Sequence, residues 1–161
     1  MPDLQRDVQL FEHFSRQLVA VLESIPADRL RERPEMNHAL WTAGHTLGGR
    51  AFLGQVCGAG DLGCGRYSDD FGVGSKPGEV PDVDKETLVA DLKASNAAAV
   101  EAVKAMTDEQ AAAESPMAQY GPLFATNAGM ASYLLGVHEA EHLGQLKAWR
   151  RAIGLAPAET A

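Results

Sequence analysis

The sequence predicts an all-α protein, most simply a single four-helix bundle. Apolar residues recur at helical spacing along most of the 161-residue chain, and no stretch shows the alternation of a half-buried strand. Four segments of similar length carry this helical pattern. With 45% hydrophobic residues the chain can bury one core and leaves little room for a second. We therefore expect one domain over residues 1–161.

The first two predicted helices are defined by their apolar stripes and by the residues at their ends. The stripe of the first helix consists of Leu4, Val8, Phe11, Leu18, Leu22 and Ile25. Pro26 ends this helix. The second helix runs from about His38 to Cys57, where Pro34 and the side-chain acceptor Asn37 form its approach and Gly58 breaks it.

The second half of the chain reads as a long connection followed by two more helices. Residues 58–83 are rich in Gly, Asp, Ser and Pro, which predicts a loop of about 25 residues. The third helix runs from near Asp84, a plausible N-cap, to Met106. An irregular stretch over residues 116–122 leads to the fourth helix, from about Thr126 to Ile153, which Gly154 stops. The last turns of this helix carry cations that suit its negative end: Lys147, Arg150 and Arg151.

Composition excludes several classes of function. The net charge of −8 argues against a DNA- or RNA-binding protein, which normally carries a basic patch. No apolar run approaches the roughly 20 residues that span a bilayer, and the amino-terminal residues lack a secretory pattern. We therefore expect a cytoplasmic protein. Cys57 and Cys64 are interpreted as two reduced thiols, because nothing else supports a redox pair or a ligand set.

The segment His138-Glu139-Ala140-Glu141-His142, on the fourth predicted helix, carries the strongest chemical signal. Histidines at positions i and i+4 lie on one helix face, about 6 Å apart, which suits two sites on one metal ion. The surrounding leucines and valine indicate a packed helix. Inward-pointing imidazoles need partners, because a buried polar group without a hydrogen bond is costly. This context favours a metal site over a chance surface pair.

A metal held by two histidines of one helix needs a further ligand from elsewhere. His45 is the best supplier, because it lies near the middle of the second helix and the pair lies near the middle of the fourth. His38 would lie about 10 Å away along the helix axis and is the weaker candidate. His13 is interpreted as a partly exposed histidine. The predicted metal ligands are therefore His45, His138 and His142.

The same segment also matches the zinc-protease pattern H-E-x-x-H, in which Glu139 would activate a water molecule. Read in the other direction, Glu141 gives the H-x-x-E-H variant. The third histidine of the extended protease pattern is absent after His142. No predicted strand precedes the helix to bind the edge of a peptide. A zinc hydrolase that uses residues 138–142 is therefore the less favoured alternative.

Two motifs connect this site to a known family. The second helix carries Trp41-Thr42-Ala43-Gly44-His45-Thr46-Leu47, and the fourth carries His138-x-x-x-His142 followed by Leu143-Gly144-Gln145. With these motifs the sequence resembles the DinB/YfiT-like superfamily of metal-binding four-helix bundles. The resemblance extends over nearly the whole chain in helix order, loop lengths and histidine placement. It implies an up-down-down-up bundle in which residues 58–83 cross over between the second and third helices.

The resemblance also implies a chemistry. A divalent ion, zinc or nickel, would be held by the three histidines, and its remaining positions would take water or substrate. Related enzymes include thiol-dependent S-transferases and the mycothiol-dependent maleylpyruvate isomerase, in which the metal lowers the pKa of a low-molecular-weight thiol. We therefore expect a metal-dependent thiol S-transferase or related group-transfer enzyme that acts on a small electrophile, and a homodimer by family analogy. The alternative is a metal-binding module without catalysis, whose ion serves stability, sensing or assembly.

Residues that flank the three histidines are further candidates for a substrate pocket. Gln145 lies one turn after His142, and Trp41, for which a core position is also expected, lies one turn before His45. Three other residues could bind an acidic co-substrate, although solvated or packing roles are expected for them: Arg50, Tyr120 and Tyr133.

Overall fold

A computed structural model describes residues 4–33 and 35–158, so Pro34, part of the predicted approach to the second helix, lies outside the described residues. The described part of the chain is all-helical and contains no strand, apart from one isolated antiparallel bridge between Glu114 and Thr126. The all-α prediction is therefore confirmed. Among the described helices, none is long and apolar enough to cross a membrane.

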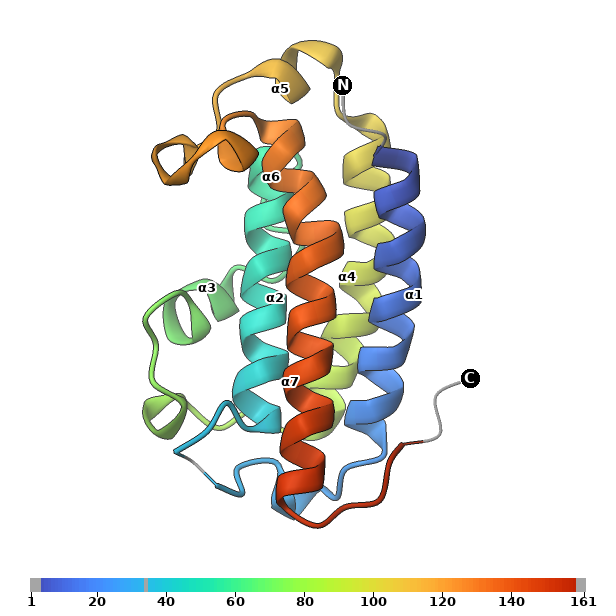
Figure 1. Cartoon of the computed structure of the whole chain (residues 1–161), viewed down its shortest axis with the longest axis vertical. Coiled ribbons are helices and arrows are strands. Elements are labelled where there is room, and N and C mark those ends of the chain that lie inside the picture. The colour runs from blue at the N-terminus through green and yellow to red at the C-terminus, as the bar shows by residue number, and fades with distance from the viewer. Residues whose placement is uncertain (1–3, 34, 159–161) are drawn as a thin grey trace.

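Four long helical segments lie side by side along the long axis of the molecule (Figure 1). They are α1 (Leu4–Glu23), α2 (Ala39–Val56), α4 (Lys85–Ala105), and a last segment that consists of α6 (Asn127–Tyr133), a π-helical turn (Leu134–His138) and α7 (Glu139–Ala152). In Figure 1, α1 and α7 run in one direction and α2 and α4 in the other. Helices α1 and α2 each pack against both α4 and α7.

The helix ends follow local capping chemistry. The Asp84 carboxylate accepts a hydrogen bond from the backbone N–H of Thr87 at 2.8 Å, and the Thr126 hydroxyl accepts one from Gly129 at 3.2 Å. Gly154 adopts a φ of 77° after the last helix, a left-handed conformation that glycine adopts without strain. These three predicted boundaries are confirmed.

The start of α2 differs from the prediction, because its N-cap is His38 and not Asn37. The His38 Nδ1 atom accepts a hydrogen bond from the backbone N–H of Trp41 at 3.2 Å. The other ring nitrogen, Nε2, is bonded to the carbonyl oxygen of Pro77 at 2.9 Å. An imidazole with both nitrogens engaged can cap a helix while it is completely buried, which is the state of His38.

The predicted loop over residues 58–83 contains a short helix that sequence periodicity did not reveal. Helix α3 (Arg66–Phe71) packs against α2 (Figure 1), and the side chains of Tyr67 and Phe71 are buried there. Glycines on α2 allow this close approach: a Cβ added at Gly44 would lie 2.3 Å from the Phe71 ring, and one at Gly48 would lie 3.2 Å from the Tyr67 carbonyl oxygen. A 3-10 turn, Pro77–Glu79, follows α3.

The region between the third and fourth predicted helices is also more structured than expected. A short helix, α5 (Asp108–Ala112), begins with a capping box formed by Thr107 and Gln110. Two 3-10 turns follow, Ala118–Tyr120 and Pro122–Phe124. They project on the same side of the molecule as α3 in Figure 1.

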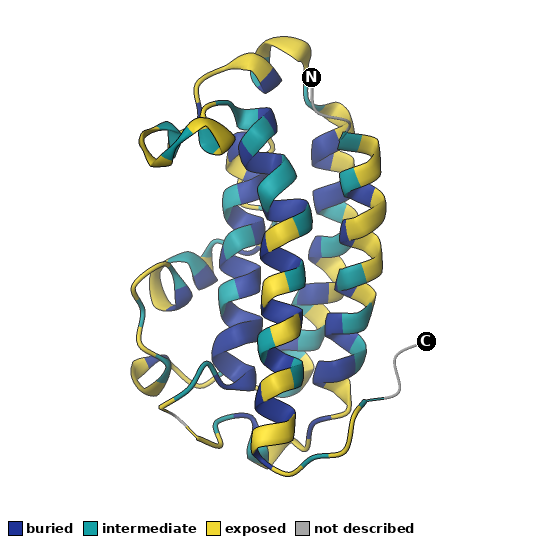
Figure 2. Cartoon of the chain, viewed as in Figure 1, coloured by how far each residue is buried: buried dark blue, intermediate teal, exposed yellow. Residues whose placement is uncertain are grey.

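The core consists of two apolar clusters stacked along the bundle axis. Figure 2 shows the buried residues concentrated on the facing sides of the long helices. One cluster includes Leu18, Leu47, Leu88, Leu143 and Trp149. The other includes Phe11, Leu53, Val103, Met130 and Leu135. Buried polar or charged residues near the middle of the bundle come from all four long segments and include Ser15, Arg50, Ser95 and Glu139.

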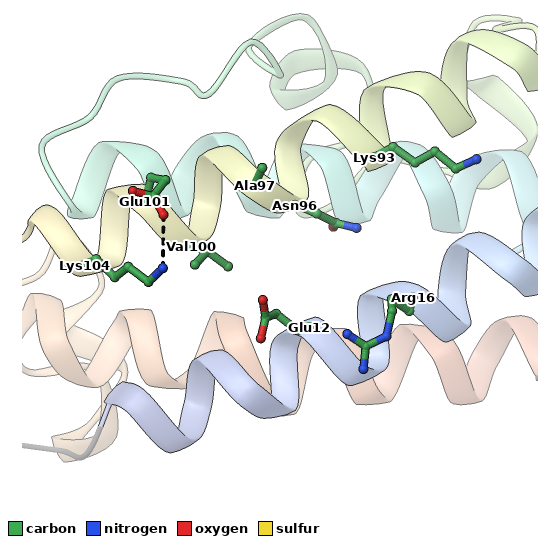
Figure 3. A pocket seen from close by; sticks show the side chains of 8 residues that line it. All are labelled: Glu12, Arg16, Lys93, Asn96, Ala97, Val100, Glu101 and Lys104. Carbon is green, nitrogen blue, oxygen red and sulfur yellow. Dashed lines mark hydrogen bonds and ion pairs between the residues drawn. The ribbon is translucent and has the colours of Figure 1, made fainter. Parts of the chain in front are cut away.

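Two surface hollows occur away from the middle of the α2–α7 contact. One, of about 360 Å³, lies between α1 and α4 and is lined mainly by charged residues such as Arg16, Lys93 and Lys104 (Figure 3). The other, of about 370 Å³, lies beside α3 and includes Tyr67, Phe71 and Asp82. Neither hollow is lined by any of the three predicted metal ligands.

Candidate metal centre

The structure brings together the three histidines that the sequence analysis selected. One potential ligand atom from each of His45, His138 and His142 lies within 4.8 Å of the other two. The ring centroids are 4.4 Å apart for the two histidines of the last segment, and His45 lies 5.3 and 4.7 Å from His138 and His142. The cluster lies where α2 packs against α7.

The local backbone places the two histidines of the last segment. His138 is the final residue of the π-helical turn, and His142 lies in the first turn of α7. A π turn inserts one extra residue into a helix, and such turns recur at functional sites. Across the interface, a Cβ added at Gly49 would lie 2.6 Å from the Cε1 atom of His138. The absence of a side chain at Gly49 therefore provides the space that the His138 ring occupies.

The His45 ring is held on two sides. Its Nδ1 donates a hydrogen bond to the backbone carbonyl oxygen of Phe71 at 2.6 Å, so that Nε2 is the nitrogen left free to bind an ion. The indole of Trp41 stacks on the ring with a centroid separation of 4.6 Å and an interplanar angle of 8°. Trp41 is itself anchored by a hydrogen bond of 2.9 Å from its Nε1 to the Ser75 hydroxyl. The segment that contains α3 therefore positions the His45 ring.

The His142 ring is oriented by a side chain of its own helix. Its Nδ1 lies 3.0 Å from Oε1 of Gln145, an amide oxygen that can only accept a hydrogen bond. The same oxygen accepts a hydrogen bond from Nδ2 of Asn37 at 3.2 Å. Gln145 thus contacts a cluster histidine, as expected of a residue that flanks the site.

Burial keeps the three imidazoles neutral. It lowers the pKa of His45, and it lowers the pKa of His142 to about 4 with a further contribution from the neighbouring His45. The pKa of His138 falls well below its ordinary value because of burial and the nearby His142, His45 and Arg50. A neutral imidazole is the form that binds a metal ion, because its nitrogen lone pair is then available.

This donor set fits a divalent transition-metal ion. Two ligand nitrogens of a tetrahedral zinc ion lie about 3.4 Å apart. The candidate ligand atoms lie within 4.8 Å of one another, so modest movements of the side chains would bring them to one ion. Imidazole ligands suit zinc, copper, iron and nickel, whereas oxygen ligands suit magnesium and calcium. Hydrogen bonds that hold the second ring nitrogen, as for His45 and His142, are typical of metal-binding histidines.

Comparison with known proteins agrees with this geometry. A family model described as the DinB superfamily matches residues 10–146, which include all three histidines and both motifs. The chain belongs to the DinB superfamily. Neither the curated proteins nor the solved structures contain a match to it.

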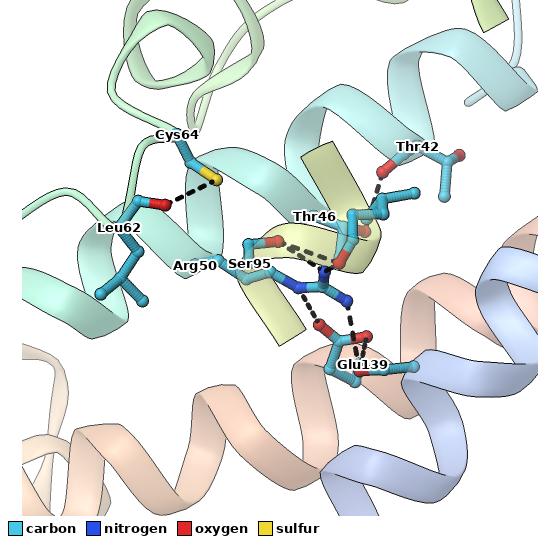
Figure 4. A network of polar contacts seen from close by, with 9 residues as sticks. Thr42, Thr46, Arg50, Leu62, Cys64, Ser95 and Glu139 are labelled. Carbon is cyan, nitrogen blue, oxygen red and sulfur yellow. Dashed lines mark hydrogen bonds and ion pairs between the residues drawn. The ribbon is translucent and has the colours of Figure 1, made fainter. Parts of the chain in front are cut away.

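Glu139 would be the water-activating base in the alternative hydrolase interpretation, but in this DinB-superfamily chain its side chain is paired with core residues. Its carboxylate forms a buried ion pair with Arg50 at 3.0 Å and accepts a hydrogen bond from the Ser15 hydroxyl at 3.4 Å (Figure 4). Arg50 also donates to the Leu92 carbonyl oxygen and the Ser95 hydroxyl. Both charged side chains are at most 2% exposed. The carboxylate therefore belongs to the core network, which argues against the hydrolase interpretation.

The remaining candidates have structural or peripheral positions. His13 is exposed, as expected, and its Nε2 lies 2.7 Å from Nε2 of Gln17. Tyr120 is exposed, whereas the half-buried Tyr133 lies between the Phe124 ring, at 5.1 Å, and the His138 ring, at 6.2 Å. Of the three residues considered for an acidic co-substrate, Tyr133 and the buried Arg50 lie near His138, whereas Tyr120 lies at the surface.

The two cysteines are buried and free. Burial raises the pKa of the Cys57 thiol to about 11 and also raises that of Cys64. Both thiols are therefore protonated at neutral pH, which agrees with their interpretation as reduced, unreactive residues.

Sequence reasoning selected Gln145 and Trp41 but missed the contacts of α3 with His45 and of Asn37 with Gln145. The glycines at positions 44 and 48, one turn apart on α2, were a signal that another segment approaches this helix closely. Tyr67 and Phe71, also one turn apart, marked α3 inside the glycine-rich connection. No sequence pattern signalled the contact between Asn37 and Gln145, because it joins residues 108 positions apart.

Proposed function

We propose that this DinB-superfamily protein is a metal-dependent enzyme whose divalent ion, zinc or nickel, is held by His45, His138 and His142. The observation that carries the proposal is the convergence of three neutral imidazoles, two of which have their Nδ1 atoms engaged by acceptors. Three protein ligands would leave coordination positions for water or substrate, as in catalytic rather than structural metal sites.

The proposed architecture is the up-down-down-up four-helix bundle implied by the family, formed by one domain over residues 1–161. The opposite directions of the α1/α7 and α2/α4 pairs in Figure 1 support it. In this arrangement residues 58–83 cross over between α2 and α4, and α3 within them supports the His45 ring.

The proposed reaction is thiol S-transfer or a related group transfer. A bound divalent ion would supply a Lewis acid that lowers the pKa of a low-molecular-weight thiol and favours its thiolate form. The chain itself would hold and shield the reacting groups: Trp41 covers one face of His45, and Tyr133 lies beside His138. The proposed partners are this thiol and a small electrophile, with a homodimer in the cytoplasm as the expected assembly.

The first experiment measures the metal content of protein purified without added metal. Wild type should contain close to one equivalent of zinc or nickel, and the variants His45→Ala, His138→Ala and His142→Ala should each lose most of it. His13→Ala, which removes an exposed histidine, is the matched control and should keep the full equivalent. A full equivalent in the three cluster variants would overturn the proposed site.

The second experiment tests catalysis in metal-loaded protein. Bacillithiol, mycothiol, glutathione and coenzyme A are each offered with small electrophiles, and loss of the free thiol is followed. Turnover that disappears in His138→Ala is the expected result. An absence of turnover with every thiol, in protein that keeps its metal, would overturn the enzymatic proposal.

A metal-binding module without catalysis is the second candidate. It is favoured by the burial of His138 and His142, whose side chains leave little surface for a substrate to reach. The coordination number distinguishes the two candidates, because a structural site is closed by a fourth protein ligand and a catalytic site keeps an exchangeable position. X-ray absorption of the nickel- or zinc-loaded protein, with and without an added thiol, measures this difference.

A further inference from the structure

A short chain of side chains connects the surface of α7 to the His142 ring. Glu141, which is exposed, accepts a hydrogen bond from Nε2 of Gln145 at 3.4 Å. The other end of the Gln145 amide, Oε1, lies 3.0 Å from Nδ1 of His142. The same oxygen also accepts the hydrogen bond from Asn37. Each member of this chain therefore constrains the next.

Which groups donate and which accept in this chain of hydrogen bonds is determined by the Glu141 carboxylate. An amide has a donor end and an acceptor end, so Asn37 and Gln145 could both turn over and still bond to each other. A neutral imidazole can likewise carry its proton on either nitrogen. An ionised carboxylate, in contrast, only accepts hydrogen bonds. Glu141 therefore requires Nε2 of Gln145 to face it, which turns Oε1 toward His142.

We propose that Glu141 and Gln145 are positioning residues that hold His142 in the tautomer with the proton on Nδ1. Because Oε1 of Gln145 cannot donate, Nδ1 of His142 must carry the proton, and Nε2 retains the lone pair that a metal ion requires. The benefit of this tautomer rests on the proposed metal site. The tautomer itself is a property of the metal-free protein.

At His45 the proton is also held on Nδ1, but by a backbone acceptor and not by a side chain. There the acceptor is the backbone carbonyl oxygen of Phe71, which is also unable to donate. A carbonyl group cannot be removed by substitution, whereas the acceptor at His142 is a side chain that can be replaced. His142 is therefore the ring whose tautomer a point substitution can change.

The test is to determine the tautomer of His142 in metal-free protein at neutral pH by long-range proton–nitrogen NMR correlations. Wild type should show the proton on Nδ1. Gln145→Leu should lose this preference, whereas Gln145→Glu should retain it, because a carboxylate at this position still accepts from Nδ1. Glu141→Gln should give a mixture of both tautomers, because the new amide can donate or accept. Gln55→Leu, at an exposed glutamine of α2, should behave as wild type.

Zinc affinity, measured by competition with a chromophoric chelator, provides the second readout. Loss of a residue that orients a metal-binding histidine typically weakens metal binding by about 10- to 100-fold. We expect this loss in Gln145→Leu and little change in Gln145→Glu. A role in stability alone would not distinguish these two substitutions.

The outcomes separate this proposal from the proposed function. If Gln145→Leu and Glu141→Gln both keep the proton on Nδ1 of His142, the positioning proposal is overturned whatever metal is bound. If the tautomer changes as expected but wild type binds no metal through its histidines, the tautomer assignment is supported and the metal site fails. Should Gln145→Leu not fold, Glu141→Gln and Gln145→Glu still decide the question, since Glu141 is exposed.

Discussion

Three imidazoles in contact within a protein interior must be neutral, and this requirement explains much of the site. Burial and mutual repulsion lower the pKa values of His138 and His142, so that neither ring carries a charge that the apolar surroundings cannot solvate. The hydrogen bonds at His45 and His142 then select which nitrogen keeps its lone pair. Neutrality and orientation thus both favour metal binding.

The stability of the metal-free protein should decrease as the pH falls from about 6.5 to 4. The pKa of His142 is about 4 in the folded protein, against an ordinary 6.5, so the unfolded chain binds more protons over this range. The shift of about 2.5 pH units corresponds to a contribution of up to about 3 kcal/mol, which is present above pH 6.5 and lost toward pH 4. Urea unfolding at a series of pH values measures this effect. The His142→Gln variant should show a shallower pH dependence than His13→Gln, and equal slopes in the two variants would contradict the expectation.

Replacement of Gly49 by alanine should weaken metal binding without unfolding the protein. The new Cβ would lie 2.6 Å from Cε1 of His138 and would displace the ring, whereas alanine itself favours the helix by about 1 kcal/mol. We expect a loss of zinc affinity of about 10-fold or more, comparable to that caused by other disturbances of ligand orientation. Chelator competition measures it. Gly144→Ala is the control, because a Cβ at Gly144 has no atom within 4 Å, and it should bind zinc as wild type does.

Helix α2 carries large aromatic side chains for the histidine cluster and also glycines that let another helix pack closely against it. It supplies Trp41 and His45 to the histidine cluster, and it accepts α3 at close distance through Gly44 and Gly48. Glycine weakens a helix, so its presence at these positions is explained by the approach of α3. Because the Phe71 carbonyl group orients His45, docking of α3 and orientation of the ring are one structural event.

Gly44→Ala should therefore disturb α3 and not α2 itself. Its Cβ would lie 2.3 Å from Cδ1 of Phe71, and we expect a destabilisation of about 1–3 kcal/mol from overpacking. Hydrogen exchange should become faster over residues 66–75, while α2 remains protected. The control is Gly144→Ala on α7, which meets no atom within 4 Å and should stabilise the protein by about 0.5–1 kcal/mol. Unchanged exchange in α3 of Gly44→Ala would refute this account.

The whole molecule is organised around a buried polar layer between its two apolar clusters. Arg50 on α2 contacts Glu139 on α7 and Ser95 on α4 (Figure 4). It also donates to the Ser15 hydroxyl on α1, so that one guanidinium group connects all four long helical segments. Its position over the Phe11 ring, 5.3 Å from the centroid, adds a cation–π contact. A charged group that is fully paired only in one register of the helices favours that register over shifted ones.

Loss of one member of the Arg50–Glu139 pair should destabilise the protein strongly. Arg50→Leu leaves the Glu139 carboxylate buried without its partner, which typically costs 3–5 kcal/mol. The double replacement Arg50→Leu and Glu139→Leu should recover much of this loss, because no unpaired charge remains. Urea unfolding measures both. Lys104→Ala, which breaks the exposed pair with Glu101, is the matched control and should change stability by at most about 1 kcal/mol.

The helices and the three histidines were predictable because their signals are local. Apolar periodicity, the Asp84 and Thr126 caps and the stop at Gly154 depend on residues within a few positions of each other, and these three predicted boundaries agree with the structure. The first helix ends at Glu23, before the predicted stop at Pro26, and α2 is capped by His38. The i, i+4 spacing of His138 and His142 likewise follows from helix geometry. The prediction that His45 lies opposite this pair needed only one further assumption, that the middles of the two helices pack against each other.

Contacts between distant residues were decided by the tertiary structure alone. The ion pair of Glu139 with Arg50, which argues against the water-activating role that the H-E-x-x-H pattern suggested, joins residues 89 positions apart. The docking of α3, the contact of His38 with the Pro77 carbonyl oxygen and the contact between Asn37 and Gln145 similarly depend on which surfaces meet after folding. Local sequence thus specifies which groups are present and how a helix spaces them. Packing decides which hydrogen bonds those groups form, and in the histidine cluster these bonds engage Nδ1 of His45 and of His142.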